Sequence, residues 1–92
     1  MKTLLLYTTL GCHLCEQAEQ LLQPVLLHLN ASLRARGMEP LQLVPVEISD
    51  STELVDAYGV RIPVIRLQER AEELGWPFDQ AQAFAFLQQQ LG

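Results

Sequence analysis

An apolar segment that runs straight into a cysteine pair is the feature that most constrains the fold of this chain. The run Leu4–Tyr7 precedes Cys12-His13-Leu14-Cys15, and a stretch with helical periodicity follows. The pair therefore predicts a strand-to-helix junction with the first sulfur at a helix N-terminus, where unpaired N–H groups and the helix dipole favour thiolate over thiol. Cys15 lies about one helical turn further on, close enough to resolve a mixed disulfide. The chain has no other cysteine, so the spacing predicts dithiol–disulfide chemistry.

The size and charge of the chain narrow the range of functions. We expect its 92 residues to form one domain, spanning residues 1–92. The net charge is −5 and the six lysines and arginines are scattered, so we expect no nucleic-acid partner. No apolar stretch approaches the roughly 20 residues that span a bilayer, and the N-terminal segment lacks the regions of a signal peptide. We therefore expect a cytoplasmic protein without a membrane partner, in a reducing compartment where structural disulfides are rare.

Apolar periodicity predicts four strands and three helices. The strands are expected at 3–8, 41–48, 60–67 and 74–76. A long helix should run from the cysteine pair to a C-terminus at Arg34–Gly37, with a kink or break at Pro24. A second helix should begin at an Asp50 N-cap and end near residue 58, and a third should follow an Asp79 cap and run to about residue 91.

The order of these elements predicts an α/β fold. The first βαβ unit should be parallel with a right-handed crossover, and the last two strands should form an antiparallel hairpin. Pro45 cannot donate to a strand ladder, so the second strand should lie at an edge of the sheet. The sequence thus predicts a four-stranded mixed sheet of order βαβαββα with helices on both faces.

Three features resemble the thioredoxin superfamily, and most closely its small glutaredoxin branch. The segment Tyr7–Cys15 is similar to the family's first strand and active-site turn, and Tyr58–Val64 is similar to its loop with a cis-proline facing the cysteines. The element order, with Pro45 on an edge strand, is the third feature. The run Gly75–Asp79 further resembles a small bacterial glutaredoxin-like subgroup. The resemblance covers almost the whole chain and implies a thioredoxin-like fold.

The chain also departs from the usual glutaredoxin and thioredoxin patterns. His13 stands where dithiol glutaredoxins have proline, and Thr9 stands where they have lysine. Residues 66–76 lack the paired-glycine motif that helps hold glutathione, and Gly11 replaces the tryptophan of thioredoxins. The family's glutathione site therefore does not carry over to this sequence, and neither does thioredoxin identity.

The cysteine pair is the expected catalytic centre. We expect Cys12 to be the nucleophile and Cys15 to be the more buried, resolving thiol. A protonated His13 beside Cys12 would stabilise the thiolate, or it would be a solvated loop histidine. Glu16 and Glu19 oppose a thiolate, because carboxylates nearby disfavour it.

The remaining expected site residues lie in the Ile-Pro loop. The resemblance implies a cis Pro63 that holds the Ile62 backbone open beside Cys12, where a substrate strand would pair by β-addition. Arg61 would supply positive charge to the site, or it would be a solvated loop arginine. No metal ligand set is expected.

These residues predict a thiol–disulfide oxidoreductase that acts on a protein disulfide or a small thiol substrate. We expect a monomer with no bound cofactor, and glutathione is the candidate reductant although its binding motif is not evident. Two alternatives stay open: metal binding through the cysteine pair, and a redox-inactive binding or adaptor module on the same fold.

Overall fold

The computed structural model describes residues 2–91, which form a four-stranded sheet with three α-helices. The strands are β1 (Lys2–Thr8), β2 (Leu41–Glu47), β3 (Val64–Leu67) and β4 (Leu74–Gly75), in the spatial order β2-β1-β3-β4. The helices are α1 (His13–Ala35), α2 (Thr52–Tyr58) and α3 (Gln80–Leu91), and a 3₁₀ turn, η1 (Ile48–Asp50), joins β2 to α2. β1 pairs parallel to β2 and antiparallel to β3, and β3 pairs antiparallel to β4. The predicted mixed α/β sheet is confirmed.

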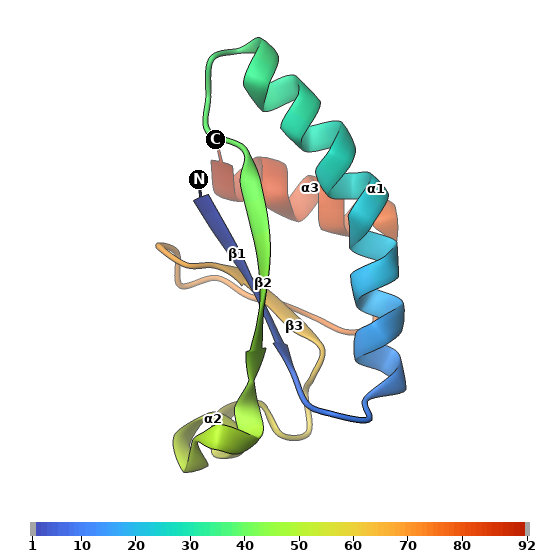
Figure 1. The fold of residues 1–92 in the computed structure, drawn as a ribbon, viewed down its shortest axis with the longest axis vertical. Helices are drawn as coiled ribbons and strands as arrows, with labels where there is room; N and C mark the ends of the chain where they lie inside the picture. Colours follow the sequence, from blue (N-terminus) through green and yellow to red (C-terminus); the bar gives the residue numbers. More distant parts are fainter. Residues whose placement is uncertain (1, 92) are drawn as a thin grey trace.

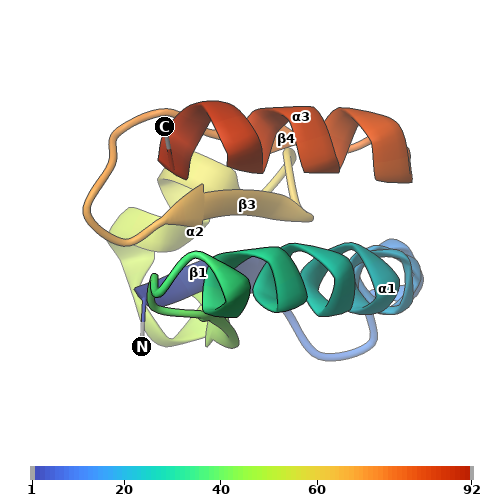
Figure 2. The same cartoon turned by 90° about the horizontal axis from the view of Figure 1, so that it is seen from above.

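The main hydrophobic core fills the space between the sheet and the two long helices. Figures 1 and 2 show α1 and α3 on one side of the sheet and α2 on the other. Alternate residues of β1, Leu4 and Leu6, are buried against Leu22 of α1 and Leu87 of α3. Because successive strand side chains point to opposite faces, the apolar run of β1 serves both sides of the sheet.

A second, smaller cluster lies on the opposite face, under α2. It contains Tyr7 of β1 and Val64 of β3, with Leu54 and Tyr58 of α2 packed against it. α2 has no fully buried residue, and Figure 1 shows it at one end of the sheet only. The expected helices on both faces are therefore present, but the α2 side is only partly covered.

β2 is an edge strand, as Pro45 predicts, and its outer edge is partly capped. The side-chain amide of Asn30 in α1 donates to Leu41 O at 3.0 Å, and its oxygen accepts from Leu41 N at 2.7 Å. An edge strand exposes unpaired backbone groups that invite pairing with another chain. Asn30 satisfies one such residue, and Pro45 removes a donor from the same strand.

Helix α1 is continuous through Pro24, so the predicted break is absent. Figure 1 shows the helix changing direction near its middle instead, which is the kink that a proline produces. Its C-terminus is the predicted one: Met38 N donates to Leu33 O at 2.8 Å and Gly37 N to Arg34 O at 3.0 Å. Gly37 has a φ of 71°, the left-handed conformation that this helix end requires.

Several boundaries differ from the predictions. β1 begins at Lys2 and β4 ends at Gly75, each one residue earlier than expected. Ser51, not Asp50, caps α2, because its hydroxyl accepts from Leu54 N while Asp50 belongs to η1. β3 begins at Val64 rather than at residue 60, because the N–H groups of Arg61 and Ile62 both donate to Tyr58 O in a turn. β2 ends at Glu47, one residue earlier than expected. The Asp79 cap is confirmed: Asp79 Oδ1 accepts from Gln82 N at 2.7 Å, and Gln82 Oε1 accepts from Asp79 N at 2.9 Å.

Within residues 2–91, no helix is both long enough and apolar enough to cross a membrane.

Candidate active site around the cysteine pair

The two cysteines lie at the junction of β1 and α1, as the sequence predicts. Cys12 is the N-cap residue of α1, and its Sγ accepts a hydrogen bond from Cys15 N at 3.1 Å. The sulfur therefore occupies the position where a helix best stabilises negative charge. Cys15 is 3% exposed, whereas Cys12 is half-buried. The two are joined in a disulfide, with their Cα atoms 5.2 Å apart.

A short turn connects β1 to the cysteines. Cys12 N donates to Thr9 O at 3.3 Å, which closes the turn. Gly11 has a φ of 77°, a conformation that side chains disfavour. Leu10 is 92% exposed, so its side chain contributes almost no packing that would hold the turn in place.

Glu47 holds this turn from the neighbouring strand. Its Oε1 accepts from Leu10 N at 2.9 Å and from Thr9 Oγ1 at 3.2 Å, and its Oε2 accepts from Ser49 N at 3.2 Å. These donors, led by the Ser49 N–H, hold the pKa of Glu47 below its ordinary value despite some desolvation. The sequence reasoning missed this residue. The available signal is topological, since parallel strands end at the same edge of a sheet and Glu47 is the last residue of β2.

His13 does not pack against the protein. Its side chain is 91% exposed, and its Nδ1 lies 3.8 Å from Glu16 Oε2. Solvent screens such an exposed pair strongly.

The Ile62–Pro63 segment reaches the same edge of the sheet as the cysteines. Val64 pairs with Tyr7 in the antiparallel register, so Pro63, the residue before Val64, lies beside the C-terminal end of β1. The Ile62–Pro63 peptide bond is cis, as expected. The Trp76–Pro77 bond is also cis, and the sequence did not predict this second one. Ile62 N donates to Tyr58 O at 3.1 Å. The backbone donor that was expected to be open for a substrate strand is therefore occupied, and pairing there would depend on the Ile62 carbonyl.

Arg61 belongs to a polar network on the α2 side. Its Nη2 lies 3.0 Å from Glu73 Oε1, and its guanidinium carbon lies 5.0 Å from the centre of the Tyr58 ring. Tyr58 also donates to Glu73 Oε2, and it stacks on Tyr7 with 4.0 Å between ring centres. Tyr7 in turn accepts from Arg66 Nη2 at 3.0 Å. The charge of Arg61 is thus compensated by Glu73.

Burial and hydrogen bonding shift two pKa values in this network. Desolvation first, and the hydrogen bond to Glu73 second, raise the pKa of Tyr58 above its ordinary range. Burial opposes ionisation of Glu73, but the hydrogen bonds from Tyr58 and Arg61 outweigh it and hold the pKa of Glu73 below its ordinary value. At neutral pH, Tyr58, Glu73 and Arg61 in this network are therefore a neutral phenol, a carboxylate and a cation paired with that carboxylate.

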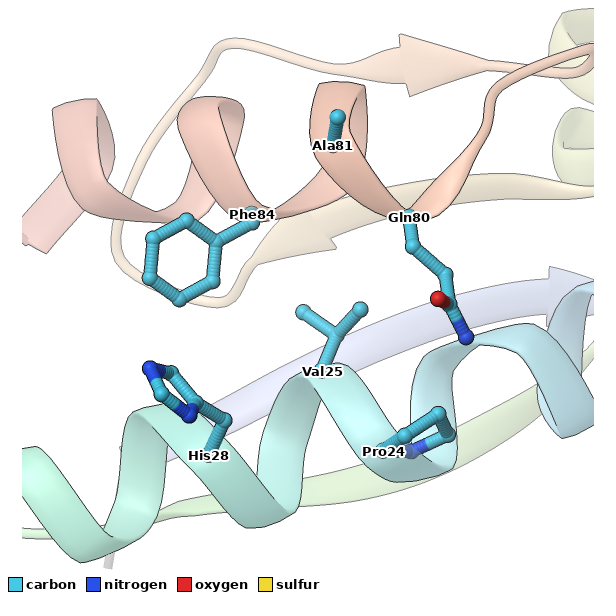
Figure 3. A pocket seen from close by; sticks show the side chains of 6 residues that line it. All are labelled: Pro24, Val25, His28, Gln80, Ala81 and Phe84. Atoms are coloured by element: carbon cyan, nitrogen blue, oxygen red, sulfur yellow. The ribbon is translucent and has the colours of Figure 1, made fainter.

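An apolar groove lies between α1 and α3, away from the cysteines. It has a volume of about 350 Å³ and is lined by Pro24, Val25, His28, Gln80, Ala81 and Phe84. Figure 3 shows His28 of α1 facing Phe84 of α3, and their ring centres are 5.4 Å apart. Pro24 is twelve residues beyond Cys12, which corresponds to about 18 Å of helix. The groove is therefore separate from the cysteine site. His28 lines the groove and is not part of the cysteine site.

No group of three or more His, Cys, Asp or Glu side chains in the described part of the chain is arranged to hold a metal ion. The two sulfurs alone supply half of a tetrahedral ligand set.

The geometry of the cysteine pair agrees with the comparisons to known proteins. The family described as "Glutaredoxin-like domain (DUF836)" matches residues 3–88. The chain belongs to the glutaredoxin-like family. No curated protein matches it significantly.

Two solved structures of one protein resemble the chain over nearly its full length. They are the X-ray and solution structures of the structural-genomics target protein XcR50 from X. campestris, each 35% identical to this chain. The X-ray structure has a TM-score of 0.71, covering 94% of this chain and 96% of XcR50. The solution structure has a TM-score of 0.70, covering 97% and 95%. The family and the cysteine pair together support a redox role on a thioredoxin-like fold.

Proposed function

We propose that this glutaredoxin-like protein is a thiol–disulfide oxidoreductase. The observation that carries the proposal is the unequal placement of the two sulfurs. Cys12 caps α1 and is partly open to solvent, whereas Cys15 is buried within disulfide distance of it. A reactive cysteine needs a stabilised thiolate and access to its substrate, and a resolving cysteine needs only to reach the first sulfur.

The reaction follows from these positions. The Cys12 thiolate attacks one sulfur of a substrate disulfide. A bond forms between them as the substrate S–S bond breaks, and the other substrate sulfur leaves as a thiolate that takes up a proton. Cys15, deprotonated, then attacks the Cys12 sulfur and displaces the second substrate thiol. Two electrons pass from the dithiol to the substrate, and an external thiol reductant restores the dithiol.

The other expected site residues have proposed roles around this centre. The Ile62 carbonyl, next to Pro63, is the remaining backbone group for a substrate strand to pair with. His13, when protonated, would favour the Cys12 thiolate. Arg61 acts on the site only at long range, because Glu73 compensates its charge.

The partners and location proposed here follow from the same chemistry. The substrate is a protein disulfide or, in the reverse direction of the exchange, a small thiol that reduces the Cys12–Cys15 disulfide. The chain works as a monomer without a bound cofactor. Glutathione is the proposed reductant in a cytoplasmic setting, where the thiol pool would return Cys12 and Cys15 to the dithiol. Because the sequence lacks the family's glutathione motif, we propose glutathione as a collision partner rather than as a tightly held ligand.

A disulfide-reduction assay tests the proposal. Purified protein with glutathione, glutathione reductase, NADPH and a soluble disulfide substrate should consume NADPH continuously. Cys12→Ser should abolish the turnover, because serine oxygen cannot form the mixed disulfide. If Cys12→Ser retained the activity of the unaltered protein, the assignment would be wrong. Metal analysis of the same freshly purified protein separates it from the metal-binding alternative.

A further inference from the structure

The turn that carries Cys12 has almost no packing of its own. The Leu10 side chain is 92% exposed, and nothing lies within 4 Å of where a Cβ on Gly11 would be. A segment with so few contacts is fixed mainly by its hydrogen bonds. One of these, Cys12 N to Thr9 O, closes the turn on itself but does not attach it to the rest of the protein.

Two bonds from α1 hold Cys12 itself, since Glu16 N donates to its carbonyl at 3.2 Å and Cys15 N donates to its Sγ at 3.1 Å. The preceding Thr9–Leu10 segment is attached by the Glu47 carboxylate. Thr8 and Glu47 are paired in the parallel register of β1 and β2, so both strands end at the same level. From there Glu47 reaches over the end of β1 to Thr9 Oγ1 and Leu10 N, at 3.2 and 2.9 Å, while Ser49 N holds its other oxygen. Hydrogen bonds to a charged acceptor are among the stronger ones in proteins.

We propose that Glu47 is a positioning residue for Cys12: its carboxylate ties the Thr9–Leu10 turn to the end of β2 and so holds the Cys12 sulfur at the N-terminus of α1. This inference rests on the proposed function, since it concerns the reactivity of the same sulfur. Glu47 acts through the turn and not by touching the reacting atoms. Without the tether, Cys12 is held at the N-terminus of α1 only by the bonds from Glu16 N and Cys15 N. The Thr9–Leu10 segment then moves more, and the sulfur spends less time where the helix stabilises its thiolate.

The charge of Glu47 and its hydrogen bonds to the turn have opposite effects on the Cys12 thiolate. Variants that change one and not the other can therefore separate the two effects. A nearby carboxylate disfavours a thiolate, whereas the tether favours it by fixing the sulfur. Glu47→Gln removes the charge and keeps one amide oxygen, which can accept from Thr9 Oγ1 and Leu10 N, although its NH2 group cannot accept from Ser49 N. Glu47→Ala removes both. Glu47→Asp keeps the charge but is one methylene shorter, so it withdraws the oxygen from the turn.

The experiment measures the alkylation rate of Cys12 in reduced protein as a function of pH, which gives the pKa of its thiol and its limiting rate. We expect Glu47→Gln to react at least as fast as the unaltered protein at neutral pH. Glu47→Ala should react about tenfold more slowly than Glu47→Gln, which corresponds to about one unit in the pKa of the thiol. Glu47→Asp should be as slow as Glu47→Ala or slower.

The control variant is Asn30→Ala. It removes two hydrogen bonds from the opposite end of β2, at Leu41, and so destabilises the same strand without touching the turn. Its Cys12 should react as in the unaltered protein. If Asn30→Ala slowed Cys12 as much as Glu47→Ala did, or if Glu47→Ala and Glu47→Gln reacted alike, the positioning role would be refuted.

Two further provisions keep the test decisive. If Glu47→Ala does not fold by circular dichroism, the comparison of Glu47→Asp with Glu47→Gln decides, and equal rates refute the tether. The alkylation ranking needs only a reduced Cys12, so it stands even if the unaltered protein fails to turn over in the disulfide-reduction assay. Failure of the proposed function and failure of this inference are therefore distinguishable.

Discussion

At the scale of single residues, the two cysteines differ in exposure and in their position on α1. Cys12 faces solvent in part and caps α1, while Cys15 is buried one turn further along the helix. A buried thiol that can reach only one other sulfur is suited to release a substrate and not to capture one.

Cys15→Ser should therefore trap the substrate on Cys12. The first attack still occurs, but no thiolate remains to displace the bound half of the substrate. We expect intact mass to show a stable glutathione adduct on Cys15→Ser after treatment with oxidised glutathione, and only an internal disulfide in the unaltered protein. Cys12→Ser is the matched control and should form much less adduct. An adduct that accumulated equally on both variants would show that the two cysteines are not specialised.

Glu73 predicts a pH dependence of stability. Its pKa is lower in the folded protein than its ordinary value of 4.5, because Tyr58 and Arg61 donate hydrogen bonds to it. The unfolded chain therefore binds the proton first as the pH falls. The stabilisation is complete above pH 4.5 and is lost as the pH drops through the lower, folded pKa. Glu73→Gln should flatten this acid dependence.

Urea unfolding of both proteins at neutral pH and at about pH 3 measures the effect, since ordinary carboxyls are mostly protonated at that pH. The free energy of unfolding should fall by more in the unaltered protein than in Glu73→Gln. Equal losses on acidification would mean that the network contributes no pH-dependent stability.

The sequence predicted the residues whose signal is local and missed those that act across the chain. Cys12 at a helix N-terminus and Gly11 in the turn follow from neighbouring residues alone. Glu47 and Glu73 do not, because their partners lie on other parts of the chain. Glu47, for example, accepts hydrogen bonds from Leu10 and Thr9, which precede it by 37 and 38 positions. The shift of the α2 cap from Asp50 to Ser51 has a different, local cause, because Asp50 belongs to η1 and the capping pattern does not reveal that tight turn.

At the scale of elements, α1 connects the site to the core. It begins at the cysteine pair and continues for 23 residues, and the buried residues along one face pack against the sheet and α3. The hydrophobic spacing predicted this face. Pro24 was expected to interrupt it, but packing on both sides of the proline keeps the helix continuous, and the interruption is reduced to a change of direction.

Truncation of Leu22 tests how strongly α1 depends on this packing. Leu22 is fully buried, so Leu22→Ala leaves a cavity and should lower the free energy of unfolding by about 2–5 kcal/mol. Leu27 lies on the same helix but is 73% exposed, and Leu27→Ala should change it by less than about 0.5 kcal/mol. Urea unfolding followed by circular dichroism provides both values. Similar losses for the two variants would contradict the assigned core face.

The prolines near β2 and β3 were informative to different degrees: Pro45 predicted the position of its strand, whereas Pro63 did not predict where β3 begins. Pro45 correctly placed β2 at the edge, because a missing donor is tolerated only there. Pro63 lies outside β3, and the residues before it form a turn instead of the expected strand. The apolar run at 60–67 did not distinguish these states, because turn residues that contact a core are also apolar. Ile62 illustrates this, since it packs against the cluster under α2. Val60 is also apolar but is fully exposed, so its residue type gave no sign of its position.

At the scale of the whole molecule, the topology gathers the site at one edge of the sheet. β1 and β2 run parallel and end together, and the antiparallel β3 begins beside them. The cysteine turn, Glu47 and the Ile62–Pro63 segment therefore meet at this edge although they are far apart in the chain. The element order predicted the sheet and the edge, and the match to the glutaredoxin-like family agrees with it. The side chains that form hydrogen bonds across that edge depend on strand register and side-chain length. The order of the elements does not determine either of these.

The most direct test of the central claim is equilibration of the protein in glutathione redox buffers, with free thiols alkylated and counted by intact mass. We expect a reversible transition between a dithiol and an internal Cys12–Cys15 disulfide, with a potential in the range of roughly −120 to −270 mV that related oxidoreductases span. A protein whose cysteines stayed in one state across the whole buffer range would contradict the oxidoreductase assignment.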